Sequence, residues 1–172
     1  MPYESPAATF TARLKTRFIL LSFVVAFVFN MLPWRDVRAV PDLVALTILF
    51  WAIHQPRRVS ISVAFLTGLL MDAANGVLLG QHALVYSIIA FAGNTLSRRI
   101  LGFSVWPQAA HVVVLLLLMQ VLMLVIRMMA GGTFPGWSYF MGGIISALLW
   151  PLATFVLLLA QRAAESDQAS TL

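Results

Sequence analysis

The chain has 172 residues, of which 61% are hydrophobic and only 10% are charged, and its mean hydropathy is +0.93. Soluble domains carry about a quarter charged residues, because water covers their whole surface, so this composition excludes an ordinary soluble domain and indicates a chain that contacts lipid. The absence of cysteine excludes a disulfide framework and a thiolate metal site. The 11 basic residues outnumber the 6 acidic ones, but they stand in small groups between apolar runs, which argues against nucleic acid as a partner.

Six apolar runs follow one another along the chain, and they predict an all-α integral membrane protein built as a bundle of six transmembrane helices. The length allows one domain, so we expect residues 1–172 to form a single transmembrane domain. The expected spans are approximately residues 17–33, 41–54, 58–72, 80–98, 107–130 and 137–161.

The first run has the features of a signal peptide at its start, because Arg13, Lys15 and Arg17 precede it. However, residues 29–33 (FNMLP) offer no small-residue cleavage site. We therefore expect the first run to be a transmembrane helix that the protein keeps.

The second and third runs, residues 43–53 and 59–71, are short and are separated by a segment that contains Arg57 and Arg58. Each covers roughly 20 Å, against a hydrocarbon core of about 30 Å, which favours a re-entrant pair. A re-entrant pair would place both arginines near the bilayer centre, where each costs at least about 2.5 kcal/mol. Two complete crossings avoid this cost through snorkelling side chains and local thinning of the bilayer, so we expect two short spans.

The orientation follows from the excess of Lys and Arg in cytoplasmic loops of membrane proteins. If the N-terminus lies inside, eight basic residues fall in cytoplasmic segments, namely Arg13, Lys15, Arg17, Arg57, Arg58, Arg98, Arg99 and Arg162. The remaining three fall outside, namely Arg35, Arg38 and Arg127. We therefore expect both termini in the cytoplasm.

No set of side chains predicts catalysis, a metal site or a cofactor. An intramembrane carboxylate would indicate proton or ion coupling, but none of the six carboxylates falls in the middle of a span. They fall on the outer face or in the cytoplasmic tails: Asp36, Asp42 and Asp72 outside, and Glu4, Glu165 and Asp167 in the tails. The three histidines are scattered over helix ends without a neighbouring carboxylate: His54, His82 and His111. No phosphate-binding loop or catalytic triad can be assembled, so we expect that the chain is not an enzyme.

Two of the outer carboxylates have identifiable positions. Asp42 follows Pro41 at the start of a helix, where a carboxylate can accept hydrogen bonds from the first free amides, so we expect it to be a helix cap. Asp72 ends the third span on the same side. For Asp72 two interpretations stay open: an ion pair with Arg35 or Arg38, and a place on a partner-binding surface.

Small residues recur at helical spacing in two places. Those at positions 60, 64, 68 and 72 share one face of the third helix, for which we expect packing inside the bundle. A second patch lies on the last helix at Gly142, Gly143, Ser146 and Ala147, and the sequence leaves open whether it faces another subunit. Gln120, near the middle of the fifth run, is expected to hydrogen-bond to another helix.

The central stretch closely resembles the MreD family of rod shape-determining membrane proteins. The resemblance is carried by residues 41–46 (PDLVAL), 68–72 (GLLMD) and 79–84 (LGQHAL), followed by 106–109 (WPQA) and 134–139 (FPGWSY). It covers almost the entire chain beyond the first fifteen residues. Each piece alone is a weak apolar motif, whereas their order and spacing together are specific.

The resemblance implies a non-enzymatic scaffold and regulator of the bacterial elongasome, which builds lateral peptidoglycan and maintains rod shape. It implies location in the inner membrane, direct binding of MreC, and RodA, a class B penicillin-binding protein and MreB as members of the same complex. The family is similar in architecture to the substrate-binding subunits of energy-coupling-factor transporters. Its signature falls on Asp42, Gly68, Asp72 and Gly80. We expect partners to bind helix faces and the outer rim near the two aspartates.

A small-solute transporter subunit of the vitamin-binding type is the alternative. Such a protein needs a pocket with several convergent polar groups, and the spans supply few beyond Asn94 and Gln120. These subunits also tend to carry an Ala-x-x-x-Ala pattern on the first helix, where residues 18–32 contain only Ala26.

Overall fold

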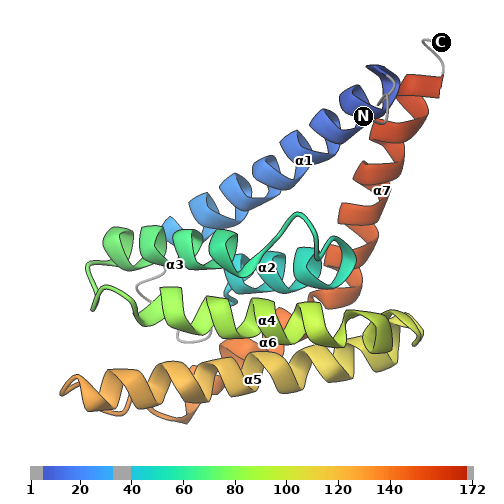
Figure 1. The fold of residues 1–172 in the computed structure, drawn as a ribbon. Coiled ribbons are helices and arrows are strands. Elements are labelled where there is room, and N and C mark those ends of the chain that lie inside the picture. The colour runs from blue at the N-terminus through green and yellow to red at the C-terminus, as the bar shows by residue number, and fades with distance from the viewer. Residues whose placement is uncertain (1–5, 33–39, 170–172) are drawn as a thin grey trace.

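The computed structural model describes residues 6–32 and 40–169, with side chains described for residues 16–32 and 40–159. These residues form helices and contain no strand, which confirms the expected all-α class for the described part of the chain. In chain order the elements are α1 (Pro6–Met31), α2 (Leu43–His54), α3 (Ile61–Asn75), α4 (Gln81–Leu101), α5 (Val105–Met129), the 3-10 turn η1 (Trp137–Phe140), α6 (Met141–Leu148) and α7 (Trp150–Ala169). Figure 1 shows α4 and α5 side by side, with α1 and α7 splayed over the other face of the molecule.

Helix α2 lies at the centre of the bundle. Every residue from 44 to 53 is buried, because α1, α4 and α6 all pack against this helix. The indole Nε1 of Trp51 donates to Ser22 Oγ of α1 (2.9 Å), which ties these two helices together. A helix of 12 residues is too short to span a bilayer alone, and α2 is covered by its neighbouring helices.

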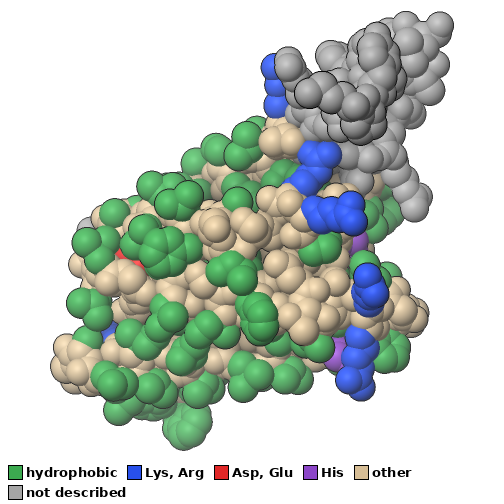
Figure 2. Space-filling view, in the orientation of Figure 1, with side chains coloured by type: hydrophobic (Ala, Val, Ile, Leu, Met, Phe, Trp, Pro, Cys, Tyr) green, Lys and Arg blue, Asp and Glu red, His purple; other side chains and the backbone are tan. Residues whose placement is uncertain are grey.

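The two ends of the bundle differ in charge. The α2–α3 and α4–α5 connections lie at one end, and the α3–α4 turn lies at the other (Figure 1). Basic side chains gather along the first of these ends (Figure 2). Arg57 and Arg58 therefore lie at an end of the bundle rather than in its middle, as two complete crossings require. The guanidinium of Arg58 donates from Nη1 to Thr16 Oγ1 of α1 (2.7 Å).

The outward faces of the peripheral helices are apolar. Leu21 on α1, Leu66 on α3, Leu118 on α5 and Leu152 on α7 are all well exposed. Two helical segments are long and apolar enough to cross a membrane, namely Val105–Met129 and Trp137–Leu159, and the apolar parts of α1, α2 and α3 are shorter. So much exposed apolar surface is typical of a lipid or protein interface rather than of a surface in water.

The last span differs from the single continuous helix expected over residues 137–161. It begins with η1 and breaks at Leu149, between α6 and α7. Pro151 gives the physical reason, because it has no N–H to donate to the carbonyl of Ala147 and its ring crowds that carbonyl. Helix α1 also differs, since it begins at Pro6, well before the expected start.

The central position of α2 predicts a difference between two identical truncations. Leu49 on α2 is completely buried, whereas Leu118 on α5 is 60% exposed. Leu49→Ala should leave a cavity and destabilise the protein by about 2–5 kcal/mol, while Leu118→Ala should stay within about 0.5 kcal/mol of the wild type. Thermal unfolding of both variants in the same detergent checks this. Equal shifts of the two midpoints would show that α2 is not the core.

Candidate functional site

The four residues expected to be the family signature lie at the end of the bundle opposite Arg57 and Arg58, and three of them surround the start of α4. Gly68 and Asp72 come from the second half of α3, Gly80 immediately precedes α4, and Asp42 immediately precedes α2. Residues far apart in the sequence are thus brought to the first two turns of one helix.

Asp72 supplies the hydrogen-bond acceptors that the start of α4 lacks. The first amides of a helix have no partner inside the helix, and Gly80 at the N-cap has no side chain to serve them. The carboxylate of Asp72 accepts from the backbone N–H groups of Gly80 (2.8 Å), His82 (2.8 Å) and Ala83 (3.3 Å). A negative charge at this position also interacts favourably with the helix dipole. Asp72 is therefore a cap provided by the preceding helix.

His82 is the side-chain partner of Asp72. Its ring Nδ1 lies 2.7 Å from Asp72 Oδ1, and the two side chains are 15% and 0% exposed. The prediction that no histidine has a neighbouring carboxylate is therefore wrong for His82. The α3–α4 turn brings His82 next to Asp72, although the two residues are ten positions apart in the sequence. Arg35 and Arg38 are the partners in one of the two interpretations left open for Asp72, and both lie outside the described residues.

Two glycines make this cap possible. A Cβ on Gly68 would lie 2.5 Å from the backbone N of Ala83 and 2.6 Å from the backbone C of His82, so only glycine lets the two backbones meet here. Asp72 follows one turn later on the same face and can therefore reach the amides of α4. Gly80 has a φ of +99°, in the region that side-chain-bearing residues avoid, and nothing crowds the space beside it.

Asp42 makes a second junction of the same kind. Its Oδ1 accepts from the Ala45 N–H (2.9 Å), which confirms the expected helix cap on α2. The same oxygen accepts from Asn30 Nδ2 of α1 (2.9 Å), and Oδ2 accepts from the Tyr86 hydroxyl of α4 (2.8 Å). Asn30 in turn accepts from the Leu43 N–H through Oδ1 (3.2 Å). One carboxylate thus joins α1, α2 and α4.

The side chains of α4 that contact the two aspartates lie one turn apart on the same face of the helix: His82 contacts Asp72, and Tyr86 contacts Asp42. Tyr86 follows His82 by one turn, and their rings lie 5.5 Å apart in an edge-to-face arrangement. We call Asn30, Asp42, Asp72, His82 and Tyr86 the carboxylate junction. Both carboxylates in it are occupied by hydrogen bonds, and the described residues contain no group of three or more side chains that could hold a metal ion. The hydrogen bonds of the junction satisfy the backbone amides at the starts of α2 and α4.

Three members of the junction were not predicted from the sequence: Asn30, His82 and Tyr86. Each is an ordinary polar residue near a helix end, and only the fold shows which carboxylate it contacts. The segment 79–84 carried the available signal, because Gly80 before a helix leaves amides that need an acceptor from elsewhere.

Both faces of small residues pack inside the described part of the bundle. Ala64, Gly68 and Asp72 are buried, which confirms internal packing for the α3 face, while Ser60 caps the start of α3 at the surface. On α6, a Cβ on Gly143 would collide with the side chain of Gln120.

Gln120 itself bonds to the segment before α6 rather than to a helix body. Its Nε2 donates to the Tyr139 carbonyl of η1 (3.1 Å). The expected contact with another helix is thus made to the 3-10 turn that begins the last span. The second small patch, at Gly142 and Gly143, lies against this same side chain.

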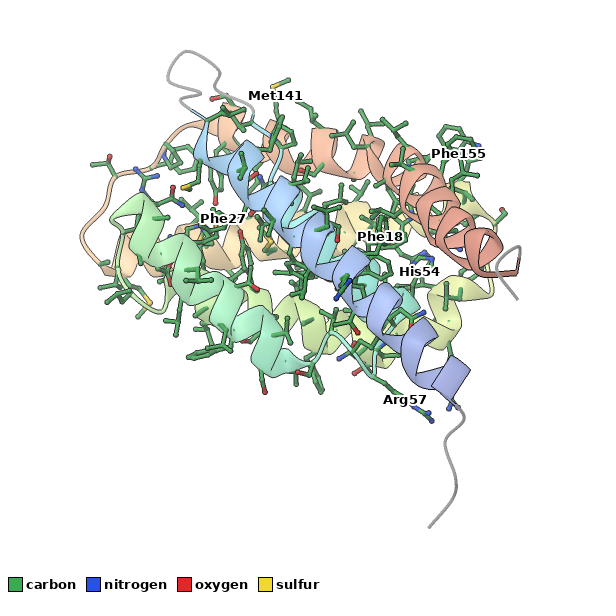
Figure 3. All side chains as sticks on the ribbon, turned by 90° about the horizontal axis from the view of Figure 1, so that it is seen from above. Phe18, Phe27, His54, Arg57, Met141 and Phe155 are labelled. Atoms are coloured by element: carbon green, nitrogen blue, oxygen red, sulfur yellow. The ribbon has the colours of Figure 1, made fainter. Side chains whose placement is uncertain are left out.

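Two apolar grooves flank α1. The α1/α7 groove, of about 570 Å³, is floored by α2 and is lined by Leu21, Val25, Leu46, Leu152 and Val156 among others. The α1/α3 groove, of about 480 Å³, lies on the other side of α1. Figure 3 shows α1 crossing the bundle diagonally between α3 and α7.

Comparison with known proteins agrees with the motifs. Residues 11–161 match the family model described as rod shape-determining protein MreD. The chain is 36% identical over 148 residues to "Rod shape-determining protein MreD" of Haemophilus influenzae, a match that covers 80% of this chain and 90% of that protein. No solved structure matches the chain, so the expected likeness to energy-coupling-factor subunits stays a prediction.

The carboxylate junction predicts a graded loss of stability. Asp72→Ala leaves three amides without an acceptor and should destabilise the protein by at least about 2 kcal/mol, because a buried unpaired donor costs about 1–3 kcal/mol. Asp72→Asn keeps one acceptor oxygen and should fall between Asp72→Ala and the wild type. Asn75→Ala, at the exposed end of the same helix, is the matched control and should be nearly neutral. Thermal midpoints and folded yield in detergent give the order, and an Asp72→Ala variant as stable as the control would contradict it.

Proposed function

The chain belongs to the MreD family of rod shape-determining proteins, and from this premise we propose that it is a non-enzymatic membrane scaffold and regulator of the elongasome. In this proposal it lies in the bacterial inner membrane with both termini in the cytoplasm. It binds MreC directly and supports lateral peptidoglycan synthesis in a complex with RodA, a class B penicillin-binding protein and MreB.

The α1/α7 groove is the observation that best supports direct binding of MreC. Its exposed lining consists of apolar side chains on two splayed helices, including Val25 and Leu152. The small residues Ser22, Ala26 and Ala153 also line it, and small residues let a further helix backbone approach closely. An amphipathic or membrane-spanning helix is the partner that such a groove accepts. We therefore assign the groove to the single membrane helix of MreC.

The burial of Asp72 argues against the expectation that a partner binds directly to this aspartate at the outer rim. The side chain is completely buried, so a partner cannot contact it without local unfolding of the α3–α4 turn. We propose that Asp72 acts on partner binding indirectly, by holding α3 and α4 in register. Loss of protein, rather than selective loss of MreC, is then the expected effect of Asp72→Ala.

The transporter alternative finds little support in the α1/α7 groove. A vitamin-type solute needs several convergent polar groups. The polar residues that line the α1/α7 groove are Ser22 and Thr47, and Ser22 already bonds to Trp51 and to the Ile19 carbonyl. A scaffold that binds apolar helices is the function that the geometry supports better.

Filling the groove tests this proposal. Val25 is 60% exposed in the α1/α7 groove, and Leu118 on α5 is equally exposed outside it. Val25→Trp should lower the amount of MreC that co-purifies by about tenfold, because overpacking of an interface costs about 1–3 kcal/mol. Leu118→Trp should leave MreC recovery unchanged. MreC would be measured by quantitative mass spectrometry per mole of folded, tagged protein extracted in mild detergent.

Two outcomes would overturn the assignment. Equal recovery of MreC with both variants would remove the groove from the interface. Recovery of a transporter's ATPases and coupling subunit in place of MreC, with the wild-type chain, would replace the scaffold by the transporter alternative.

A further inference from the structure

The α1/α3 groove differs from the α1/α7 groove in having a basic residue at one end. Its walls are an apolar stripe of α1 that includes Leu20 and Val24, and a stripe of α3 that includes Val63 and Leu70. Arg58 closes the groove where α2 joins α3. The groove is therefore amphipathic, because its walls are mainly apolar and the positively charged side chain of Arg58 lies at one end.

The length of this groove matches one leaflet of a bilayer. Along α1 it runs from Thr16 to Phe27, which at about 1.5 Å per residue is roughly 16 Å. The hydrocarbon core of a bilayer is about 30 Å thick, so the groove covers about half of it. An acyl chain also occupies one leaflet, so a groove of this length can accommodate one acyl chain.

The electrostatics of the mouth favour an anion. Arg58 is half-buried and is oriented by its hydrogen bond to Thr16, and Arg17 and Arg57 are exposed at the same end. Figure 3 shows Arg57 projecting from this end of the molecule, far from Phe27 at the other end of the groove. Among the described side chains, both carboxylates belong to the junction at the opposite end.

We propose that the α1/α3 groove binds an anionic glycerophospholipid. One acyl chain lies along the α1 and α3 stripes, and the phosphate of the headgroup lies beside Arg58. The volume of about 480 Å³ falls within the range of about 300–1,000 Å³ that is usual for ligand sites. Basic pockets between membrane helices are known to select anionic headgroups. This site is separate from the α1/α7 groove and does not depend on MreC binding.

Native mass spectrometry of the purified full-length chain tests the proposal. The protein would be titrated with phosphatidylglycerol and with phosphatidylcholine of identical acyl chains. The wild type should retain phosphatidylglycerol preferentially. Arg58→Gln keeps a hydrogen-bond donor for Thr16 but removes the charge, and it should lower the preference about fivefold, the factor expected for one basic side chain at a membrane surface. Arg58→Lys should retain most of it.

Two matched controls distinguish lipid binding in the α1/α3 groove from general attraction of anionic lipid to the basic end of the bundle. Arg99→Gln removes an exposed charge at the same end, on α4 and outside the groove, and should leave the preference unchanged. Val24→Trp fills the groove without changing charge and should reduce retention of both lipids, whereas Leu118→Trp on α5 should not. Equal retention of the two lipids by the wild type, or equal losses with Arg58→Gln and Arg99→Gln, would overturn the proposal.

Crosslinking in native membranes identifies the occupant directly and does not require Arg58 variants to fold. A photo-reactive amino acid in place of Leu20, which lines the groove and is 60% exposed, should form adducts with phospholipid. A dominant adduct with a protein would assign the groove to a partner helix and overturn the lipid proposal.

Discussion

The structure depends on how the first amides of α4 are satisfied. Where water is scarce, every backbone polar group needs a partner within the protein, and Gly80 offers none from its side chain. Asp72 meets this requirement from the preceding helix, and it can do so only because Gly68 lets the two backbones meet. His82 and Tyr86 then extend the same stripe of α4 towards Asp42, which caps α2 and reaches α1 through Asn30. Four helices are thus fixed at one end by two carboxylates.

The central helices of the molecule are packed more closely than the peripheral helices α1 and α7. Helix α4 packs closely on both α2 and α3, whereas α1 and α7 make far fewer contacts with each other and with α3 and α5. The two apolar grooves lie beside the less tightly packed helix α1. In the proposed function the centre therefore sets the geometry, and the grooves provide the binding surfaces for a partner helix and for lipid. The aspartates contribute to binding by maintaining the shape of the bundle.

Much of the fold could be predicted from the sequence because composition and periodicity are local signals. The apolar runs predicted the helices, and Pro41-Asp42 predicted the cap on α2. The break at Leu149 was also encoded locally, by Pro151, although the long apolar run concealed it. The carboxylate junction could not be predicted in the same way, because Tyr86 and Asp42 are 44 positions apart and only packing brings them together. The expectation that Asp72 lies on a partner-binding surface failed for the same reason. The side chain is buried by α4, and the position of α4 cannot be deduced from the residues around Asp72.

The central claim is that Asp72 replaces the missing cap of α4, and hydrogen–deuterium exchange at single-residue resolution tests it most directly. The first amides of a helix normally exchange quickly, because nothing inside the helix protects them. The start of α5 is a natural comparison, since Ser104 makes no side-chain capping bond there. In the wild-type protein we expect the amides of Gly80, His82 and Ala83 to exchange far more slowly than those of Val105 and Trp106. Equally fast exchange at both helix starts would contradict the account.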